Sequence, residues 1–185
     1  QAIEVGYRHI DTAQSYFNEE AVGEGIRRSG IDRSELFVTT KVWLDNYGED
    51  ATYASVKASL EKLGLEYVDL MLLHQPFNDV YGSWRALEQA QADGLIHSIG
   101  VSNFEAHHLA PILEQGRIMP AVNQIESHPY FANRELHRFN AKHGIITEAW
   151  APLARGTVLG EASIIEIAHE VGARQSQVVL RWALQ

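Results

Sequence analysis

The stretch Val68-Asp69-Leu70-Met71-Leu72-Leu73-His74 decides the fold: it is almost wholly apolar and ends on a histidine. A β-strand that is buried on both faces has such a continuous apolar run, and strands of this kind belong to parallel sheets that helices cover. Segments with the apolar periodicity of helices precede and follow the stretch, at Ala51–Leu63 and Tyr81–Ala92. The sequence here therefore predicts one strand of a parallel sheet, joined on either side to a helix.

The same alternation extends outward in both directions. Strand-like runs begin 24 to 32 residues apart, a spacing that is typical of repeated strand–helix units and too wide for hairpins. The predicted strands are Tyr7–Asp11, Leu36–Lys41, Val68–His74, Ile96–Ser102, Ala121–Ile125 and Ile145–Ala149. Further helices are predicted at His107–Gln115, Ser163–Val171 and Ser176–Gln185. Gly64 is expected to end the helix Ala51–Leu63. Strict alternation of this kind predicts a parallel sheet.

Polar residues at strand ends separate the two architectures that a parallel sheet allows, an open doubly wound sheet and an eight-stranded barrel. An open sheet concentrates its chemistry near one switch point, whereas a barrel collects it from many strand ends. The polar residues at or just after the predicted strand ends are Asp11, Lys41, His74, Ser102, Asn103 and Glu126. We therefore expect an α/β fold, a (β/α)8 TIM barrel, as a single domain over residues 1–185. Because a complete barrel has about 250 residues, we expect this one to lack its first and last strands and to be incomplete at both ends.

Composition narrows the range of functions. The chain has 185 residues, 45% of them hydrophobic, a net charge of −9 and no cysteine. Dispersed negative charge disfavours a nucleic acid or an anionic membrane surface as partner. The lack of cysteine excludes disulfides and thiolate metal sites, which suits a reducing cytoplasm. No apolar run approaches the roughly 20 residues that span a bilayer. We expect a cytoplasmic protein without a nucleic-acid or membrane partner.

Four residues at or near strand ends have complementary chemistry: Asp11, Tyr16, Lys41 and His74. An ammonium group beside a phenol favours the phenolate and makes the phenol a stronger acid at neutral pH. A carboxylate beside the lysine keeps that ammonium charged and oriented, and a histidine can hold a substrate oxygen in place. If the strands are neighbours, the four side chains form a general acid that is matched to the working pH.

Five segments together resemble the successive signatures of the aldo-keto reductases, in the right order and over the whole chain. They are Gly6–Ala13 (GYRHIDTA), Val38–Trp43 (VTTKVW), Leu72–Pro76 (LLHQP), Gly100–Phe104 (GVSNF) and Asn123–Glu126 (NQIE). Among members, the bacterial enzymes similar to 2,5-diketo-gluconate reductase and related aldehyde reductases look nearest. The resemblance implies a carbonyl reductase in which Tyr16 donates the proton, Lys41 and Asp11 tune it, and His74 orients the substrate.

The resemblance also implies a cofactor and a pocket. Ser102, Asn103 and Gln124 match positions that hold the nicotinamide carboxamide. Trp150 stands where the family usually has a stacking tyrosine, and Pro152 and Leu153 lie in its segment near the pyrophosphate. Trp43 and Gln75 match the substrate pocket. The expected cofactor is NADPH, the expected partner is a small carbonyl substrate, and the expected oligomeric state is a monomer.

Three departures from the family pattern leave alternatives open. Gln75 replaces a common tryptophan and makes the pocket wall more polar, and Ala151 replaces a serine. The segment that grips the 2′-phosphate in the family has no counterpart here, so NADH stays open beside NADPH. A barrel glycosidase with Asp11, Glu126 and Glu148 as candidate carboxylates stays open, as does a slow regulatory module with the reductase fold. The nine histidines lack the i, i+4 pairing of a zinc site, and we expect no metal.

Overall fold

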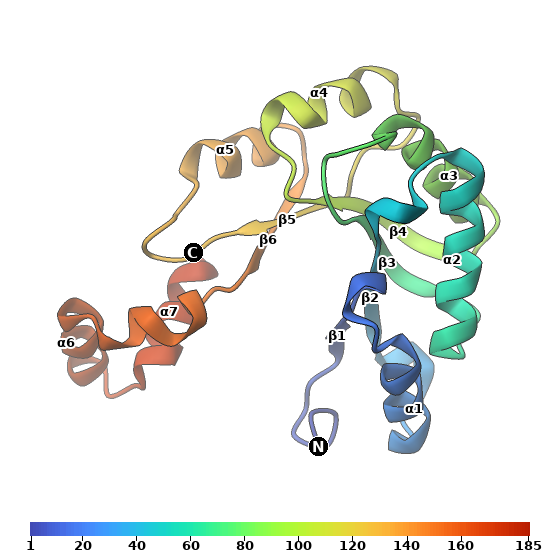
Figure 1. Ribbon diagram of the computed structural model, residues 1–185. Coiled ribbons are helices and arrows are strands. Elements are labelled where there is room, and N and C mark those ends of the chain that lie inside the picture. The colour runs from blue at the N-terminus through green and yellow to red at the C-terminus, as the bar shows by residue number, and fades with distance from the viewer. The chain divides into compact units, whose positions relative to one another are not determined.

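The computed structural model describes all 185 residues, which divide into two compact units, Gln1–Val122 and Asn123–Gln185. Each unit is built from parallel-sheet strands and the helices that connect them (Figure 1).

The first unit contains four parallel strands in the spatial order in which they occur in the chain. The strands are β1 (His9–Asp11), β2 (Phe37–Val42), β3 (Val68–Leu73) and β4 (Ile96–Ser102). The helices of this unit are α1 (Glu19–Ser29), α2 (Glu49–Leu63), α3 (Val80–Ala92) and α4 (Ala106–Gln115). Short 3-10 turns lie at η1 (Gln14–Tyr16), η2 (Arg33–Glu35) and η3 (Leu44–Asn46). The strand order does not reverse along the sheet. A barrel requires such an order, whereas a doubly wound sheet contains a reversal.

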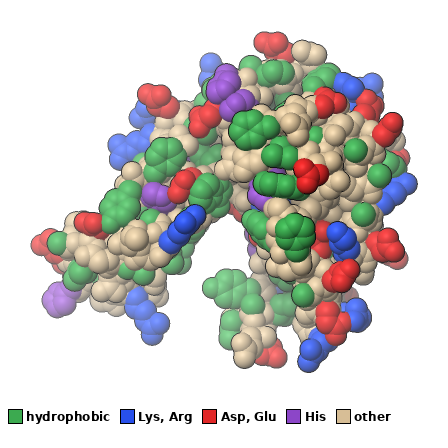
Figure 2. Space-filling model, viewed as in Figure 1, with side chains coloured by type: hydrophobic (Ala, Val, Ile, Leu, Met, Phe, Trp, Pro, Cys, Tyr) green, Lys and Arg blue, Asp and Glu red, His purple; other side chains and the backbone are tan.

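The core of this unit lies around β3. Leu70, Met71, Leu72 and Leu73 are at most 1% exposed, which confirms that the deciding stretch is buried on both faces. Trp84 of α3 is fully buried behind the sheet, and its indole N–H donates to the backbone oxygen of Ile118 at 3.1 Å. Acidic and basic side chains alternate over the outer surface formed by α2 and α3, without a patch of one sign (Figure 2).

Helix α1 was not predicted, because Gly23 and Gly25 weaken its helical propensity. The structure explains Gly23: a β-carbon added there would lie 2.1 Å from the backbone oxygen of Leu63 in α2. The glycine thus allows α1 and α2 to approach backbone to backbone. At the end of α2, Gly64 has φ +65° and caps the helix in the left-handed conformation, as predicted.

The second unit carries the C-terminal strands and helices. Its strands are β5 (Val122–Glu126, which begins at the last residue of the first unit) and β6 (Ile146–Trp150), which are neighbours. Its helices are α5 (Arg134–Lys142), α6 (Ala162–Glu170) and α7 (Gln175–Ala183), with the 3-10 segment η4 (Ala154–Gly160) after β6. Helix α5 was also missed, because its sequence RELHRFNAK has few apolar residues to reveal a periodicity. Helices α6 and α7 contact each other as a hairpin (Figure 1).

The α/β prediction is confirmed, and every predicted strand lies within two residues of its observed bounds. The largest difference is at β1, which begins at His9 rather than Tyr7 because Tyr7 is 66% exposed and its N–H bonds a local turn at Ala2. That residues 1–185 form one domain, incomplete at both ends, stays a prediction.

Candidate active site

The structure brings Asp11, Tyr16, Lys41 and His74 together in the first unit. Asp11 ends β1, Lys41 lies near the end of β2, and His74 follows β3 directly. These strands are hydrogen-bonded neighbours, and the His74 N–H donates to the Val42 oxygen at 3.2 Å beyond the last paired residues. Tyr16 reaches the same place from η1, the turn that follows β1. Neighbouring parallel strands thus deliver their carboxyl ends to one location, as predicted.

The Lys41 ammonium is the centre of the group. The side chain is fully buried, and its Nζ donates to the Asp11 carboxylate, to the Thr12 backbone oxygen at 3.0 Å and to the Tyr16 hydroxyl at 3.4 Å. Its three N–H donors therefore have three acceptors, and the carboxylate balances its charge. Tyr16 is 48% exposed, so its hydroxyl connects a buried charge to the solvent-accessible side of the site.

His74 lies next to the tyrosine and is held neutral. Burial, and then the Lys41 ammonium, lower the pKa of His74 from 6.5 to about 4, although the Asp11 carboxylate opposes the shift. Its Nδ1 lies 3.4 Å from the Ser15 hydroxyl, and its Nε2 has no hydrogen-bond partner within the chain. In the tautomer whose Nδ1 accepts a hydrogen bond from the Ser15 hydroxyl, the neutral ring carries its proton on Nε2 and can donate a hydrogen bond to a ligand oxygen there.

Two aromatic rings frame the imidazole. The Tyr16 and Trp43 rings meet it edge to face, with centroid distances of 5.8 Å and 5.1 Å. Trp43 therefore lies beside His74, and its role in a substrate pocket stays a prediction. Gln75, the other predicted pocket residue, is held by its backbone: the Tyr47 hydroxyl donates to the Gln75 oxygen at 2.8 Å and accepts from its N–H at 3.1 Å. Burial raises the pKa of Tyr47, so this residue serves as a neutral anchor.

The turn that carries Tyr16 is held by contacts that the sequence did not predict. The Thr12 hydroxyl donates to the Asn18 side-chain oxygen at 2.6 Å. The Thr40 hydroxyl donates to Glu19 at 2.7 Å, and this glutamate is only 3% exposed. Asn18 and Glu19 lie two and three residues after Tyr16, whereas Thr12 follows Asp11 and Thr40 precedes Lys41. A signal was present in the sequence, since polar side chains beside a predicted strand end require partners once they are buried.

Ser102 and Asn103 lie at the end of β4, close to His74. Ser102 is 1% exposed, and Asn103 has φ +64°, a conformation that asparagine tolerates better than most residues. The Asn103 amide donates to the His74 backbone oxygen at 3.0 Å and to the Ser102 hydroxyl at 3.2 Å. Two predicted cofactor residues thus lie in the same unit as the four central ones.

The other predicted cofactor residues belong to the second unit. Gln124 of β5 is 6% exposed and donates to Glu148 of β6 at 2.7 Å. Trp150 ends β6, and Pro152 and Leu153 follow it. Ala151 before them has φ +50°, a conformation unusual for alanine. That these four residues line the same site as Lys41 stays a prediction.

The structure contains neither a cluster of metal-ligating side chains nor a helix able to span a membrane. No group of three or more histidine, aspartate or glutamate side chains is arranged to hold a metal ion. No helix has both the length and the apolar character needed to cross a membrane.

Comparison with known proteins decides the family. Residues 1–185 match the model of the aldo/keto reductase family along their whole length. The chain belongs to the aldo-keto reductases. Glyoxal reductase of Bacillus subtilis (strain 168) is 48% identical over 185 residues, which cover 100% of this chain and 67% of that protein.

Solved structures of aldo-keto reductases match equally well. One from Brucella melitensis has a TM-score of 0.96 at 43% identity and covers 99% of this chain and 72% of its own. One from Bombyx mori, in complex with NADP, has a TM-score of 0.92 at 36% identity and covers 98% of this chain and 67% of its own. These neighbours are (β/α)8 barrels, which confirms the predicted fold class. The chain spans about two thirds of the length of such relatives.

Family membership makes the chain an oxidoreductase and sets aside the glycosidase alternative. The structure agrees with that outcome, because the Asp11 carboxylate that a glycosidase would use as acid or nucleophile is paired with the Lys41 ammonium.

Proposed function

We propose that this aldo-keto reductase reduces small aldehydes and ketones with NADPH, and that Tyr16 protonates the carbonyl oxygen. The observation that supports this most directly is the buried Lys41 ammonium between the Asp11 carboxylate and the Tyr16 hydroxyl, 3.4 Å from the latter. A cation in a site of low dielectric stabilises the developing phenolate far more than it would in water.

Each side chain then has a defined task. Tyr16 releases its proton to the substrate oxygen as negative charge develops there, and Lys41 stabilises the phenolate that remains. The Asp11 carboxylate pairs with the buried Lys41 ammonium and holds it in place. His74, neutral at physiological pH, donates from Nε2 to the same oxygen and fixes its position. The Trp43 ring confines the substrate beside the imidazole.

The predicted cofactor residues have suitable chemistry for a nicotinamide. The amide and hydroxyl side chains of Ser102, Asn103 and Gln124 suit a carboxamide, and the Trp150 indole suits stacking on a flat ring. When bound, the cofactor supplies the hydride that reaches the carbonyl carbon. NADPH is proposed over NADH because a structural neighbour holds NADP. The residues expected to hold it are Ser102, Asn103, Gln124, Trp150, Pro152 and Leu153.

Small polar carbonyl compounds are the proposed substrates. Gln75 places an amide directly after His74, where a second oxygen of a dicarbonyl or hydroxyaldehyde could bond with it. The glyoxal reductase among the relatives supports this class. We further propose a monomer that acts in the cytoplasm.

The decisive experiment compares the protein with its Tyr16→Phe variant. We expect NADPH oxidation with glyoxal or methylglyoxal, slower oxidation of NADH, and a loss of kcat of about 100-fold or more in the variant. The NADPH dissociation constant, measured by tryptophan fluorescence, should stay within about two-fold, because the hydroxyl contributes to proton transfer rather than to cofactor binding. Equal loss of turnover and cofactor binding would assign Tyr16 a structural role.

A further inference from the structure

The side-chain amide of Gln14 is unusual in joining three parts of the first unit. Its oxygen accepts from the Trp43 backbone N–H at 2.8 Å and from the Asn46 side-chain amide at 2.9 Å. Its nitrogen donates to the Ser59 hydroxyl at 3.0 Å and to the Ser55 backbone oxygen at 3.3 Å. Gln14 itself opens η1, the turn that ends on Tyr16. One amide therefore links the tyrosine turn, the loop that carries Trp43, and helix α2.

Only an amide satisfies all four partners. Two of them are N–H donors and two are oxygen atoms, of which the Ser55 backbone oxygen can only accept. A carboxylate would keep the two acceptor bonds and place a charged oxygen against that carbonyl. An apolar side chain would lose every bond and leave buried polar groups, including the Ser59 hydroxyl, short of partners.

Packing does not replace these bonds. An open surface pocket of about 590 Å³ is lined among others by Gln14, Trp43, Asn46 and Ser59. Ala13 before Gln14 is fully buried, whereas the Gln14 side chain borders the pocket and is restrained there by its four hydrogen bonds. The contacts of Asn18 and Glu19 restrain the other side of the turn but do not reach the Trp43 loop.

We propose that Gln14 is a positioning residue that sets the Tyr16 hydroxyl against Lys41 and couples it to the Trp43 wall of the pocket. The proposal rests on the proposed function of Tyr16. A proton donor whose hydroxyl lies 3.4 Å from its activating ammonium loses efficiency when it moves by even about an ångström.

The test compares Gln14→Leu with the matched control Gln89→Leu. Gln89 is exposed on α3, and its amide makes only a surface bond to Asp93 at 2.9 Å. For Gln14→Leu we expect kcat with methylglyoxal to fall about 10-fold or more, while KM and the NADPH dissociation constant change by less than about three-fold. The control should keep the parent kcat.

Hydrogen exchange followed by mass spectrometry gives a second measurement that does not need turnover. Gln14→Leu should accelerate exchange in residues 14–18 and also in residues 43–48, because both depend on the same amide. A parent protein that does not oxidise NADPH with any aldehyde contradicts the proposed function, and exchange alone then decides the coupling. Faster exchange in only one of the segments 14–18 and 43–48 would overturn the proposed coupling by Gln14.

A purely structural role has a different signature. It would lower the melting temperature and leave kcat within about two-fold of the parent below that temperature, and this result would overturn the proposal. If Gln14→Leu does not fold, Gln14→Glu serves instead, since it keeps the acceptor bonds to the Trp43 loop. The smaller kcat loss then expected must again exceed that of Gln89→Leu.

Discussion

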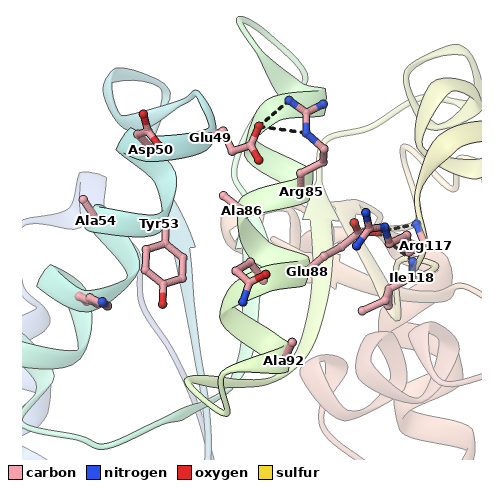
Figure 3. Close-up of a pocket in the computed structure, with 12 residues that line it drawn as sticks. Glu49, Asp50, Tyr53, Ala54, Arg85, Ala86, Glu88, Ala92, Arg117 and Ile118 are labelled. Carbon is pink, nitrogen blue, oxygen red and sulfur yellow. Dashed lines mark hydrogen bonds and ion pairs between the residues drawn. The ribbon is translucent and has the colours of Figure 1, made fainter.

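The Tyr16 site and the groove between α2 and α3 teach different things about where function lies. The groove has a volume of about 650 Å³ and is lined in part by charged side chains (Figure 3). Three of its charged side chains already have partners: Arg85 makes two bonds to Glu49, at 2.6 Å and 3.0 Å, and Glu88 accepts from the backbone N–H groups of Arg117 and Ile118.

The Tyr16 site has fewer charged side chains, but its buried ammonium contacts a residue that solvent can reach. Lys41 is fully buried, whereas Tyr16, whose hydroxyl it contacts, is 48% exposed as a residue, and the neighbouring His74 Nε2 has no hydrogen-bond partner within the chain. A buried cation acts through a low dielectric, and an exposed pair such as Arg85–Glu49 is screened by water. We therefore expect reactivity at the Tyr16 site, where a buried charge contacts a solvent-accessible residue, rather than among the screened surface charges of the groove.

The largest expected effect comes from exchanging a lysine in each region for methionine. Lys41→Met removes the cation that stabilises the phenolate, and we expect kcat to fall about 100-fold or more. The pH dependence of any residual rate should also shift, since the phenol no longer faces an ammonium.

Lys57→Met is the matched control for this exchange. Lys57 is exposed in the groove, with its Nζ 4.6 Å from the centre of the Tyr53 ring. Its kcat should equal that of the parent within about two-fold, because a screened surface charge contributes little. Similar losses in both variants, or an unchanged pH profile for Lys41→Met, would remove the distinction between the two regions.

Glu88→Ala should separate stability from activity. Glu88 is 8% exposed and accepts from two backbone N–H groups at 2.6 Å and 2.9 Å. Leaving those groups without an acceptor should lower the free energy of unfolding by about 1–3 kcal/mol. Urea unfolding measures that loss, and steady-state assays at 25 °C should show an unchanged kcat. A matching loss of activity would mean that the groove communicates with the site.

Acidification should weaken the fold in a way that depends on His74. The pKa of His74 is lowered from 6.5 to about 4 in the folded chain, so the unfolded chain binds a proton that the folded chain does not. This contribution to stability is therefore fully present above pH 6.5 and is lost as the pH falls toward 4. Comparing melting temperatures of the parent and His74→Gln across this range measures it. The melting temperature of the parent should fall more on acidification than that of the variant. Parallel falls in the two melting temperatures would contradict the lowered pKa of His74.

These regions also differ in how far the sequence predicts them. The strand ends could be predicted because β3 is apolar on both faces and repeated units place Asp11, Lys41 and His74 at equivalent positions. The role of Tyr16 was implied by family resemblance, and its distance from Lys41 came only from the structure.

The roles of three residues could not be predicted from the sequence because they depend on tertiary contacts. Gln14 forms bonds to residues 29 to 45 positions away, and no local pattern marks such partners. Gly23 weakens a helix locally and yet makes possible the close approach of α1 to Leu63. Glu88 looks like any surface charge on a helix until the loop at Arg117 covers it. In each case the role of the residue depends on a contact with a neighbour that is distant in sequence.

The smallest expected effect is that of Arg85→Ala in the groove. The side chains of Arg85 and Glu49 are 42% and 57% exposed, so water screens their attraction, and ordering both side chains costs entropy that offsets it. We expect the melting temperature to stay within about two degrees and kcat within about two-fold. Differential scanning fluorimetry and the methylglyoxal assay measure both. A variant that melts normally but turns over slowly would be the most damaging result, because it would show that a group satisfied within its own region still controls the distant tyrosine.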